Sequence, residues 1–349
     1  MSEGGNDTVA RQGGNSVGAA MKLVRFGLPL LLLLCGAVGS GMWWLHSPLT
    51  LKADKVQIDI APGASAREVA QALLAAGVDS SPFLLSQWFR WSGQERKIRA
   101  GSYEIDRSFT PVALLSALVR GEQTLASIRL LEGWTFHRFR AELAMAEALK
   151  PTTAMMSDSE IMDRLGAAGV APEGRFFPDT YFYSRGSKDF AVLEQAYRAM
   201  QSRLHSAWNE RAPDTPLRSA DDALILASIV EKETGATAER GWVASVFVNR
   251  LRIGMPLQTD PTVIYGLGNR FDGNLRKRDL IADTPFNTYT RNGLPPTPIS
   301  MPGKDSLLAA VRPQQTKALY FVAKGDGSSQ FSETLAEHNR AVDKYQRRK

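Results

Sequence analysis

The chain has 349 residues, of which 44% are apolar and 22% are charged, and its formal net charge is +6. This length and composition are typical of a globular protein with about two domains. Lys and Arg are mixed with acidic residues, and no basic stripe alternates with aromatic residues, so nucleic-acid binding is set aside. The single cysteine, Cys35, excludes an intrachain disulfide framework and a metal site built from several cysteines.

The amino-terminal region changes abruptly in composition. Residues 1–20 are small, polar and rich in glycine, and we predict a disordered cytosolic tail over residues 1–25. Residues 26–45 carry no charge. Twenty helical residues span about 30 Å, which is the thickness of the hydrocarbon core of a bilayer. We therefore predict a transmembrane helix over residues 26–45.

The flanks of this segment predict its direction. Lys22 and Arg25 precede it, and Trp43 and Trp44 lie at its far end, where aromatic rings prefer the membrane interface. We expect a single-pass protein of the inner membrane, with a cytosolic amino terminus and a periplasmic remainder. A cleaved signal peptide is the alternative, because residues 37–39 resemble a small-residue cleavage site.

The next region contains two similar strand-turn-helix patterns. Residues 56–77 and 126–147 each combine an alternating apolar run, a turn with Gly, a capping residue and a helical apolar stripe. Between them we predict a helix at 81–92, a strand at 101–105 and a helix at 110–120. Together they predict a small α/β module over residues 50–148, which binds or positions a ligand rather than catalysing a reaction.

From about residue 150 the chain predicts a second domain, so the fold class is α+β. Five aromatic residues lie between residues 176 and 183. They could form a wall on which sugars stack, but such a cluster is more often a hydrophobic seam between two lobes. We favour the seam.

A buried helix with an acidic end follows. Ser219 and Asp222 form a capping box, and residues 223–230 are apolar on nearly every side, which indicates a buried helix. The helix ends in Glu231 and Glu233, and Gly235 can supply the left-handed residue after it. The two glutamates differ by about 200° around the helix axis and cannot face the same way.

This helix end favours an uncharged carboxyl group. The negative end of the helix dipole, a like-charged neighbour and partial burial all raise the pKa of a carboxyl group. A carboxyl with a raised pKa can act as a general acid at neutral pH. The alternative is a pair of solvated glutamates at a fraying helix end, with Lys232 between them as counter-ion.

The remaining sequence predicts short helices and one long loop. A helix starts at Thr237 and ends at Gly254, and Asp260 caps a short helix with Pro261 at its first position. Residues 284–303 form a polar, proline-rich loop, and loops of this length inside a domain are usually functional. A hairpin over 318–332 and a closing helix capped by Thr334 follow.

Familiar site motifs are missing from the sequence. The four histidines have no paired-ligand spacing, and there is no phosphate-binding or dinucleotide-binding motif. We therefore expect no metal and no cofactor. Acid–base catalysis by a carboxyl group is the leading chemistry by elimination.

Several long motifs resemble those of the YceG family: LASIVEKETG, ERGWVASVFVNRLRIGMPLQTDPTVIYGLG, FNTYTRNGLPPTPI and FSETLAEHN. The resemblance covers residues from about 25 to 345. It implies an amino-terminal membrane anchor, a LysM-like glycan-binding module and a mixed α+β catalytic domain over residues 150–349. Two positions depart from the usual pattern, because Met301 stands where a polar residue is common and Ser329 where a histidine is frequent.

The resemblance also implies a reaction. Members are lytic murein transglycosylases, which cleave the β-1,4 bond between N-acetylmuramic acid and N-acetylglucosamine in nascent glycan strands and leave 1,6-anhydro ends. The catalytic acid of the family is the second glutamate of the EKET motif, here Glu233. Candidates for holding the glycan, each of which could instead cap a turn, are Gln258, Asp260, Asn287 and Tyr289. Penicillin-binding peptidoglycan synthases are implied as partners, and cleavage would terminate glycan elongation.

A lytic reaction explains a single catalytic carboxyl group. Ordinary glycoside hydrolysis needs a second carboxylate as base or nucleophile, whereas in the lytic reaction the sugar's own C6 hydroxyl attacks C1. One glutamate can then protonate the leaving oxygen and afterwards remove the C6 hydroxyl proton. Two alternatives stay open, namely a non-catalytic scaffold tethered to the membrane and a conventional hydrolase.

Overall fold

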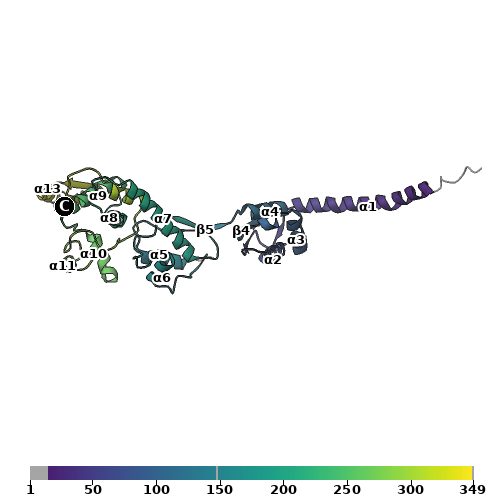
Figure 1. Ribbon diagram of the computed structural model, residues 1–349, viewed down its shortest axis with the longest axis horizontal. Coiled ribbons are helices and arrows are strands. Elements are labelled where there is room, and N and C mark those ends of the chain that lie inside the picture. The colour runs from purple at the N-terminus through teal and green to yellow at the C-terminus, as the bar shows by residue number, and fades with distance from the viewer. Residues whose placement is uncertain (1–14, 147, 348–349) are drawn as a thin grey trace, which may run out of the picture. The chain divides into compact units, whose positions relative to one another are not determined.

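The computed structural model describes residues 15–146 and 148–347, with side chains from residue 31 onward. The chain divides into two compact units, Met1–Thr124 and Leu125–Lys349. Most helices of the two units and some of their strands are labelled in Figure 1.

The first element is the long helix α1, Asn15–His46. Its start corrects the predicted tail over residues 1–25, because residues 15–25 are helical, in keeping with the helix propensity of Ala, Met and Leu. Residues 1–14 of that tail lie outside the described residues. The predicted transmembrane segment, 26–45, lies within α1, and the side chains of residues 26–30 are outside the described part. Among the described residues, no helix combines the length and the apolar character needed to cross a membrane.

The rest of the first unit consists of short strands and three helices. In chain order these are β1 Thr50–Leu51, β2 Lys55–Ile60, α2 Ala66–Ala76, β3 Val78–Asp79, α3 Pro82–Trp91, the 3-10 turn Glu95–Lys97, β4 Gly101–Asp106 and α4 Pro111–Arg120. Strand β2 pairs antiparallel with β4, and β1 pairs antiparallel with β3. Burial alternates along β2, so that one face packs into the core with α2. The capping residue predicted in the first pattern is Ser65, which forms a capping box with Glu68 at the start of α2.

The second strand-turn-helix pattern belongs to the second unit. Strand β5, Leu125–Arg129, pairs antiparallel with β7, Thr180–Ser184, and α5, Phe136–Met145, packs into the core of that unit. The boundary between units therefore falls after Thr124, not at residue 148 as predicted. Apolar periodicity identifies the buried face of a strand or helix but not the element that covers it.

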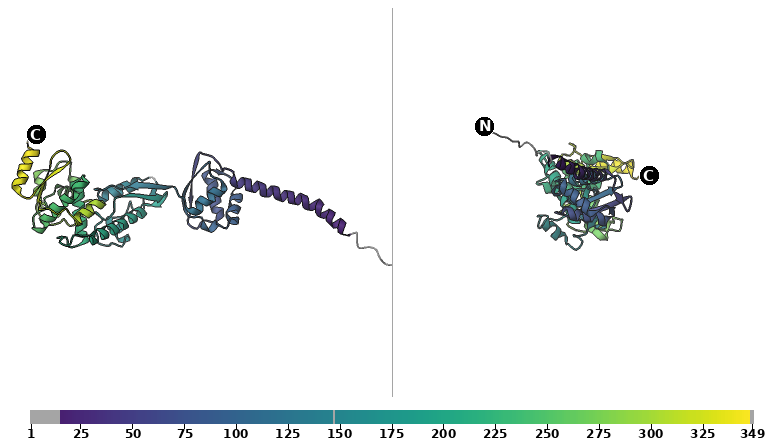
Figure 2. Two further views of the ribbon diagram at one scale, coloured as in Figure 1. Left: turned by 90° about the horizontal axis from the view of Figure 1, so that it is seen from above. Right: turned by 90° about the vertical axis from the view of Figure 1, so that its right-hand side faces the viewer.

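The second unit is mainly helical, with three small two-stranded sheets. Besides β5, α5 and β7, its elements are β6 Leu149–Lys150, α6 Asp158–Arg164, β8 Ser187–Lys188, α7 Asp189–Asn209, α8 Ala220–Glu233, α9 Arg240–Arg252, α10 Asp260–Leu267, α11 Lys277–Ile281, α12 Lys304–Val311, β9 Tyr320–Ala323, β10 Ser329–Ser332 and α13 Leu335–Tyr345, with 3-10 turns at Thr237–Glu239 and Gly268–Arg270. Strands β6 and β8 are parallel, and β9 and β10 form the predicted antiparallel hairpin. The hairpin and α13 are the yellow segments of Figure 2.

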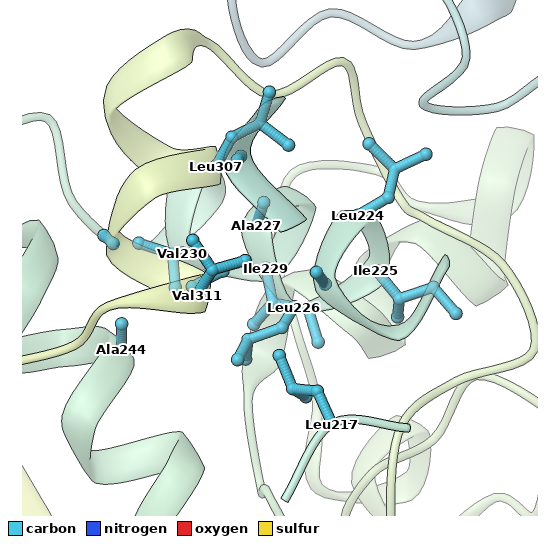
Figure 3. Close-up of a cluster of buried hydrophobic side chains, with 14 of the residues drawn as sticks. Leu217, Leu224, Ile225, Leu226, Ala227, Ile229, Val230, Ala244, Leu307 and Val311 are labelled. Atoms are coloured by element: carbon cyan, nitrogen blue, oxygen red, sulfur yellow. The ribbon is translucent and has the colours of Figure 1, made fainter. Parts of the chain in front are cut away.

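Helix α8 runs through the main core of this unit. Residues 223–230 are all buried, as predicted, and they pack against side chains of α7, α9 and α12 (Figure 3). The Ser219 hydroxyl accepts a hydrogen bond from the backbone N–H of Asp222 at 3.1 Å, so the predicted cap is present. The predicted capping box is only half formed, because the Asp222 carboxylate accepts the backbone N–H of Arg218 at 2.8 Å instead of that of Ser219. The prediction for Gly235 was wrong, because its φ is not positive and the helix ends instead where Thr234 becomes extended, at φ −142° and ψ 131°.

The aromatic cluster forms part of the core. Phe176, Phe177, Tyr181 and Tyr183 are buried, and only Phe182 is exposed, on the outer face of β7. Phe177 packs in the core around α8, whereas the other three buried rings pack in the neighbouring core with α5. The interpretation as a hydrophobic seam is therefore confirmed.

Candidate active site

The last turn of α8 gives its two glutamates different surroundings. The Glu231 side chain is 6% exposed, and its carboxylate lies 3.1 Å from the Arg240 guanidinium. Its second oxygen accepts hydrogen bonds from the Gly303 backbone N–H at 2.9 Å and the Ser306 hydroxyl at 2.7 Å. Glu231 thus ties the end of α8 to the starts of α9 and α12, and these contacts occupy its carboxylate.

Glu233 faces a cavity instead. It is half-buried, and it lines a space of roughly 370 Å³ that is also bounded by residues of α9, the 257–260 segment, the hairpin and α13. Three of the predicted glycan contacts, Gln258, Asp260 and Tyr289, line the same cavity. The structure therefore brings together four of the five predicted site residues.

The pKa of the Glu233 carboxyl is raised above its ordinary value. Burial is the largest cause, and the nearby Asp260 carboxylate adds to it. A hydrogen bond donated by the Thr259 hydroxyl to Glu233 Oε1 and the charge of Arg250 act in the opposite direction. Burial prevails, so Glu233 holds its proton at higher pH than a solvated glutamate, as a general acid must.

A strained turn positions these groups. Gln258 has φ 49°, and among the described residues it is the only one other than glycine with a positive φ. This conformation is costly for a side-chain-bearing residue and occurs most often at functional sites. The backbone N–H groups of Gln258 and Thr259 donate to the carbonyl and hydroxyl oxygens of Thr288, each at 3.1 Å. The turn presents the Thr259 hydroxyl to Glu233.

The predicted long loop supplies two residues with different roles. The Tyr289 hydroxyl donates to Asp260 Oδ1 at 2.6 Å, which joins the loop to the start of α10 across the cavity wall. Asn287 is fully buried and does not line the cavity. Its amide donates to the Ala282 carbonyl at 2.7 Å and accepts from the Tyr289 N–H at 2.9 Å. The prediction of a direct glycan contact at Asn287 was wrong, and its alternative, a turn-capping role, is confirmed.

Sequence reasoning missed three residues of the cavity. Arg250 is buried on α9 and donates to the carbonyls of Leu319 at 2.8 Å and Leu257 at 2.7 Å, while its guanidinium faces Glu233. His338 stacks on Tyr320 with ring centroids 5.3 Å apart. Burial, followed by the charge of Arg250, lowers the pKa of His338, so the ring is neutral at neutral pH. These residues come from α9, β9 and α13. Arg250 and His338 each lie in one of the motifs quoted above, whereas Tyr320 lies in none of them.

The two departures from the family pattern lie outside this cavity. Met301 is fully buried in the core next to α5, and its backbone pairs with Gly133 at 2.9 Å and Trp134 at 2.8 Å. The backbone N–H and hydroxyl of Ser329 both donate to the Glu239 carboxylate at 2.7 Å. Both residues therefore serve packing and hairpin attachment rather than the cavity. Over residues 15–146 and 148–347, no group of three or more His, Cys, Asp or Glu side chains is arranged to hold a metal ion.

The fold and the cavity define an α+β protein with a half-buried carboxyl group, that of Glu233, in a cavity of its second unit. Residues 58–344 match the YceG-like family, and the chain belongs to this family. The resemblance drawn from the sequence motifs is thereby confirmed.

Three similar proteins place the chain within the family. An endolytic murein transglycosylase of Bacillus subtilis is 32% identical over 309 residues, covering 83% of this chain and 84% of that protein. One from Streptococcus pneumoniae serotype 2 is 25% identical over 358 residues, covering 92% of this chain but 64% of that longer protein. A crystal structure of a YceG-like protein from Listeria monocytogenes is 26% identical, with a TM-score of 0.53, and the match covers 82% of this chain and 98% of that one.

Proposed function

We propose that the chain is an endolytic murein transglycosylase. It cleaves the β-1,4 bond between N-acetylmuramic acid and N-acetylglucosamine within nascent glycan strands and leaves 1,6-anhydro ends, which terminates strand elongation. The observation that carries this proposal is the half-buried Glu233, whose pKa is raised by burial and which lines a polar cavity. The activity of the Bacillus subtilis relative, similar over most of both chains, supports it.

Glu233 serves as acid and then as base. Its carboxyl proton passes to the glycosidic oxygen as the bond from C1 to that oxygen breaks. The C6 hydroxyl oxygen of the muramic acid bonds to C1, and the Glu233 carboxylate takes the hydroxyl proton, so the enzyme returns to its starting state. No water is consumed in this sequence, and no second carboxylate is needed.

The surroundings of Glu233 fit both roles. Burial and the Asp260 carboxylate favour the protonated acid before the bond breaks. Once the proton has left, the Thr259 hydroxyl and the charge of Arg250 stabilise the carboxylate that must act as base. Because these influences oppose one another, the pKa of Glu233 suits a group that must first give up a proton and then take one back.

One observation favours a second candidate, conventional hydrolysis. Asp260 lines the same cavity as Glu233, and glycoside hydrolases use two carboxyl groups. Hydrolysis consumes water and leaves a reducing end, whereas the lytic reaction leaves an anhydro end. The hydrogen bond from Tyr289 to Asp260 supports a positioning role for Asp260 and the lytic reaction.

Product analysis tests the function. Protein comprising residues 48–349 is incubated with isolated glycan strands, and the new ends are identified by mass spectrometry. Anhydro ends from within the strands are expected, and Glu233→Gln should bind strands without cutting them. Reducing ends would indicate hydrolysis, and an intact strand would favour a non-catalytic scaffold.

The location and partners are proposed as well. Residues 26–45 would anchor the protein in the inner membrane with both units from Thr50 onward in the periplasm, as the uncharged run and the preceding Lys22 and Arg25 suggest. The first unit would be a LysM-like glycan-binding module, and penicillin-binding synthases would be partners. Membrane fractionation and protease accessibility in spheroplasts test the proposed membrane anchor and periplasmic location. Release of the protein from membranes by high salt would contradict the anchor. Co-purification of the full chain with a synthase tests the partnership.

A further inference from the structure

A second and larger cavity lies beside the Glu233 cavity, within the same unit. Its volume is roughly 840 Å³, and its walls come from the start of α5, from residues 171–173, from α10 and the turn after it, and from residues 297–299. A space of this size is within the range of small-molecule binding sites. The acid–base mechanism makes no use of it.

The two cavities share one structural junction. Lys232 lines the larger cavity, and the next residue, Glu233, lines the smaller one. In the same way, Pro261 lines the larger cavity and the preceding Asp260 lines the smaller one. The end of α8 and the start of α10 thus separate the cavities, so that a polymer bound at Glu233 reaches the second cavity by crossing one junction.

The chemistry of the larger cavity suits an uncharged polar ligand with an apolar face. Phe271 and Tyr265 contribute half-buried aromatic rings, and Thr135, Asn269 and Thr297 contribute uncharged polar side chains. Sugars bind proteins through this combination, because an aromatic ring covers the apolar face of the pyranose while hydroxyl groups take hydrogen bonds.

The charged side chains on the walls already make polar contacts within the protein. Of the acidic residues, Asp158 pairs with Arg140 at 2.8 Å, and Glu173 is 7% exposed and hydrogen-bonded within the protein. The cationic side chain of Lys232 lies against the Gly133 carbonyl at 3.4 Å. The remaining titratable side chains of the lining are His137 and Tyr265. No cluster of cations therefore marks this cavity for an acidic ligand.

Glu173 fixes the walls in place. Its two carboxylate oxygens accept the Phe136 backbone N–H at 3.1 and 3.2 Å, at the first turn of α5. One of them also accepts the Tyr265 hydroxyl from α10, at 3.1 Å. Because α5 and α10 are held together through one buried side chain, the cavity between them is formed before any ligand binds, which lowers the entropic cost of binding.

We propose that this cavity binds a further saccharide segment of the glycan strand whose scissile bond lies at Glu233. The proposal rests on the proposed function, since it assumes a glycan in the smaller cavity. It makes the second cavity the part of the site that distinguishes a long strand from a short fragment, with Phe271 as the ring under the distant sugar.

The test measures binding, which separates it from catalysis. The full chain carrying Glu233→Gln is titrated by calorimetry with peptide-free glycan strands, with strands that carry peptide and with disaccharide fragments, each with and without Phe271→Ala. Loss of one ring contact should weaken binding of long strands about fivefold, while binding of the fragments stays the same. Phe182→Ala, which removes an exposed ring on β7, is the matched control and should change neither. If Phe271→Ala folds poorly, Asn269→Ala takes its place, because it changes an exposed residue of the same cavity. We expect it to weaken the binding of long strands in the same way.

The outcomes distinguish this proposal from the proposed function. Equal binding of long strands with and without the Phe271 and Asn269 substitutions overturns the inference, even if the unsubstituted protein cuts normally. An effect seen only with strands that carry peptide would assign the cavity to the peptide and would also overturn the inference. The absence of any strand binding would overturn it as well. In the cutting enzyme, Phe271→Ala should raise KM about fivefold and leave kcat unchanged. Failure of the unsubstituted protein to cut would remove the proposed function but leave the binding result to decide the cavity.

Discussion

The Thr259 hydroxyl donates a hydrogen bond to Glu233 Oε1. It thereby joins the N-cap position of α10, which the sequence wrongly assigned to Asp260, to the last residue of α8. This bond stabilises the carboxylate form of Glu233 and opposes the effect of burial on its pKa. Glu233 and the turn that carries other residues of the cavity are therefore linked directly by a hydrogen bond.

Thr259→Val should slow cleavage and shift its pH dependence. Without the hydroxyl, the pKa of Glu233 rises further, so the alkaline limb of the kcat profile moves to higher pH. The variant also stabilises the Glu233 carboxylate less in the interval between the two proton transfers. Because one hydrogen bond to a charged group is lost, kcat should fall about tenfold. A pH series of initial rates measures both effects. Thr237→Val, at an exposed threonine, is the control, and an alkaline limb at its original pH would contradict the assignment.

The two glutamates of α8 should separate activity from stability. Glu233→Gln should abolish cleavage and leave the free energy of unfolding little changed, because its carboxyl faces a cavity. Glu231→Gln breaks a buried ion pair with Arg240 and should cost about 3 kcal/mol of stability. Urea unfolding and strand cleavage on both variants decide this. Normal cutting by the Glu233 variant together with an inactive, stable Glu231 variant would reverse the assignment.

The buried Glu173 should make stability depend on pH. Burial raises its pKa from 4.5 to about 7. Between these values the folded state binds a proton that the unfolded state has released, so the free energy of unfolding falls as pH rises from about 4.5 to above 7. A shift of this size corresponds to about 3 kcal/mol.

Glu173→Gln should remove that slope, because the amide stays uncharged at every pH. Urea unfolding at about pH 5 and about pH 8 compares the variant with the parent and with Glu333→Gln, an exposed control. The parent and control should lose about 3 kcal/mol more than the Glu173 variant over this interval. Parallel pH dependences for all three proteins would mean that Glu173 is ionised throughout.

Ser228 should be required to attach the long loop to α8. Its hydroxyl donates to the Ile225 carbonyl at 2.7 Å and accepts the Ile299 backbone N–H at 3.0 Å, and the side chain is fully buried. Ser228→Ala leaves the Ile299 N–H without this partner and should cost about 2 kcal/mol. Urea unfolding measures the loss against Ser202→Ala, an exposed serine of α7, which should change stability by less than about 0.5 kcal/mol. Equal stabilities would show that water replaces the hydroxyl.

Local features of the sequence predicted local structure well. The cap at Ser219, the buried body of α8, the β9–β10 hairpin and the capping box at Thr334 are all confirmed. Each depends on residues within three or four positions of one another, or on the period of the apolar pattern. The opposite directions of Glu231 and Glu233 follow from the same helical geometry.

The sequence misplaced the features that depend on distant partners. Strand β5 pairs with β7 across more than fifty residues, so the first unit ends at Thr124 although the strand-turn-helix pattern continues. Asn287 is polar and lies in a functional loop, but whether such a side chain faces a cavity or the backbone depends on the packing of that loop.

By itself the sequence determined the family, the elements and which acid stands at the end of a buried helix, because these follow from motifs, caps and periodicity along the chain. Only the tertiary structure decided that Glu231 is bound by Arg240, Gly303 and Ser306 while Glu233 lines a cavity. The pKa of a carboxyl group depends on burial and on the charges around it, and those come from elements that are remote in sequence and meet only when the chain folds.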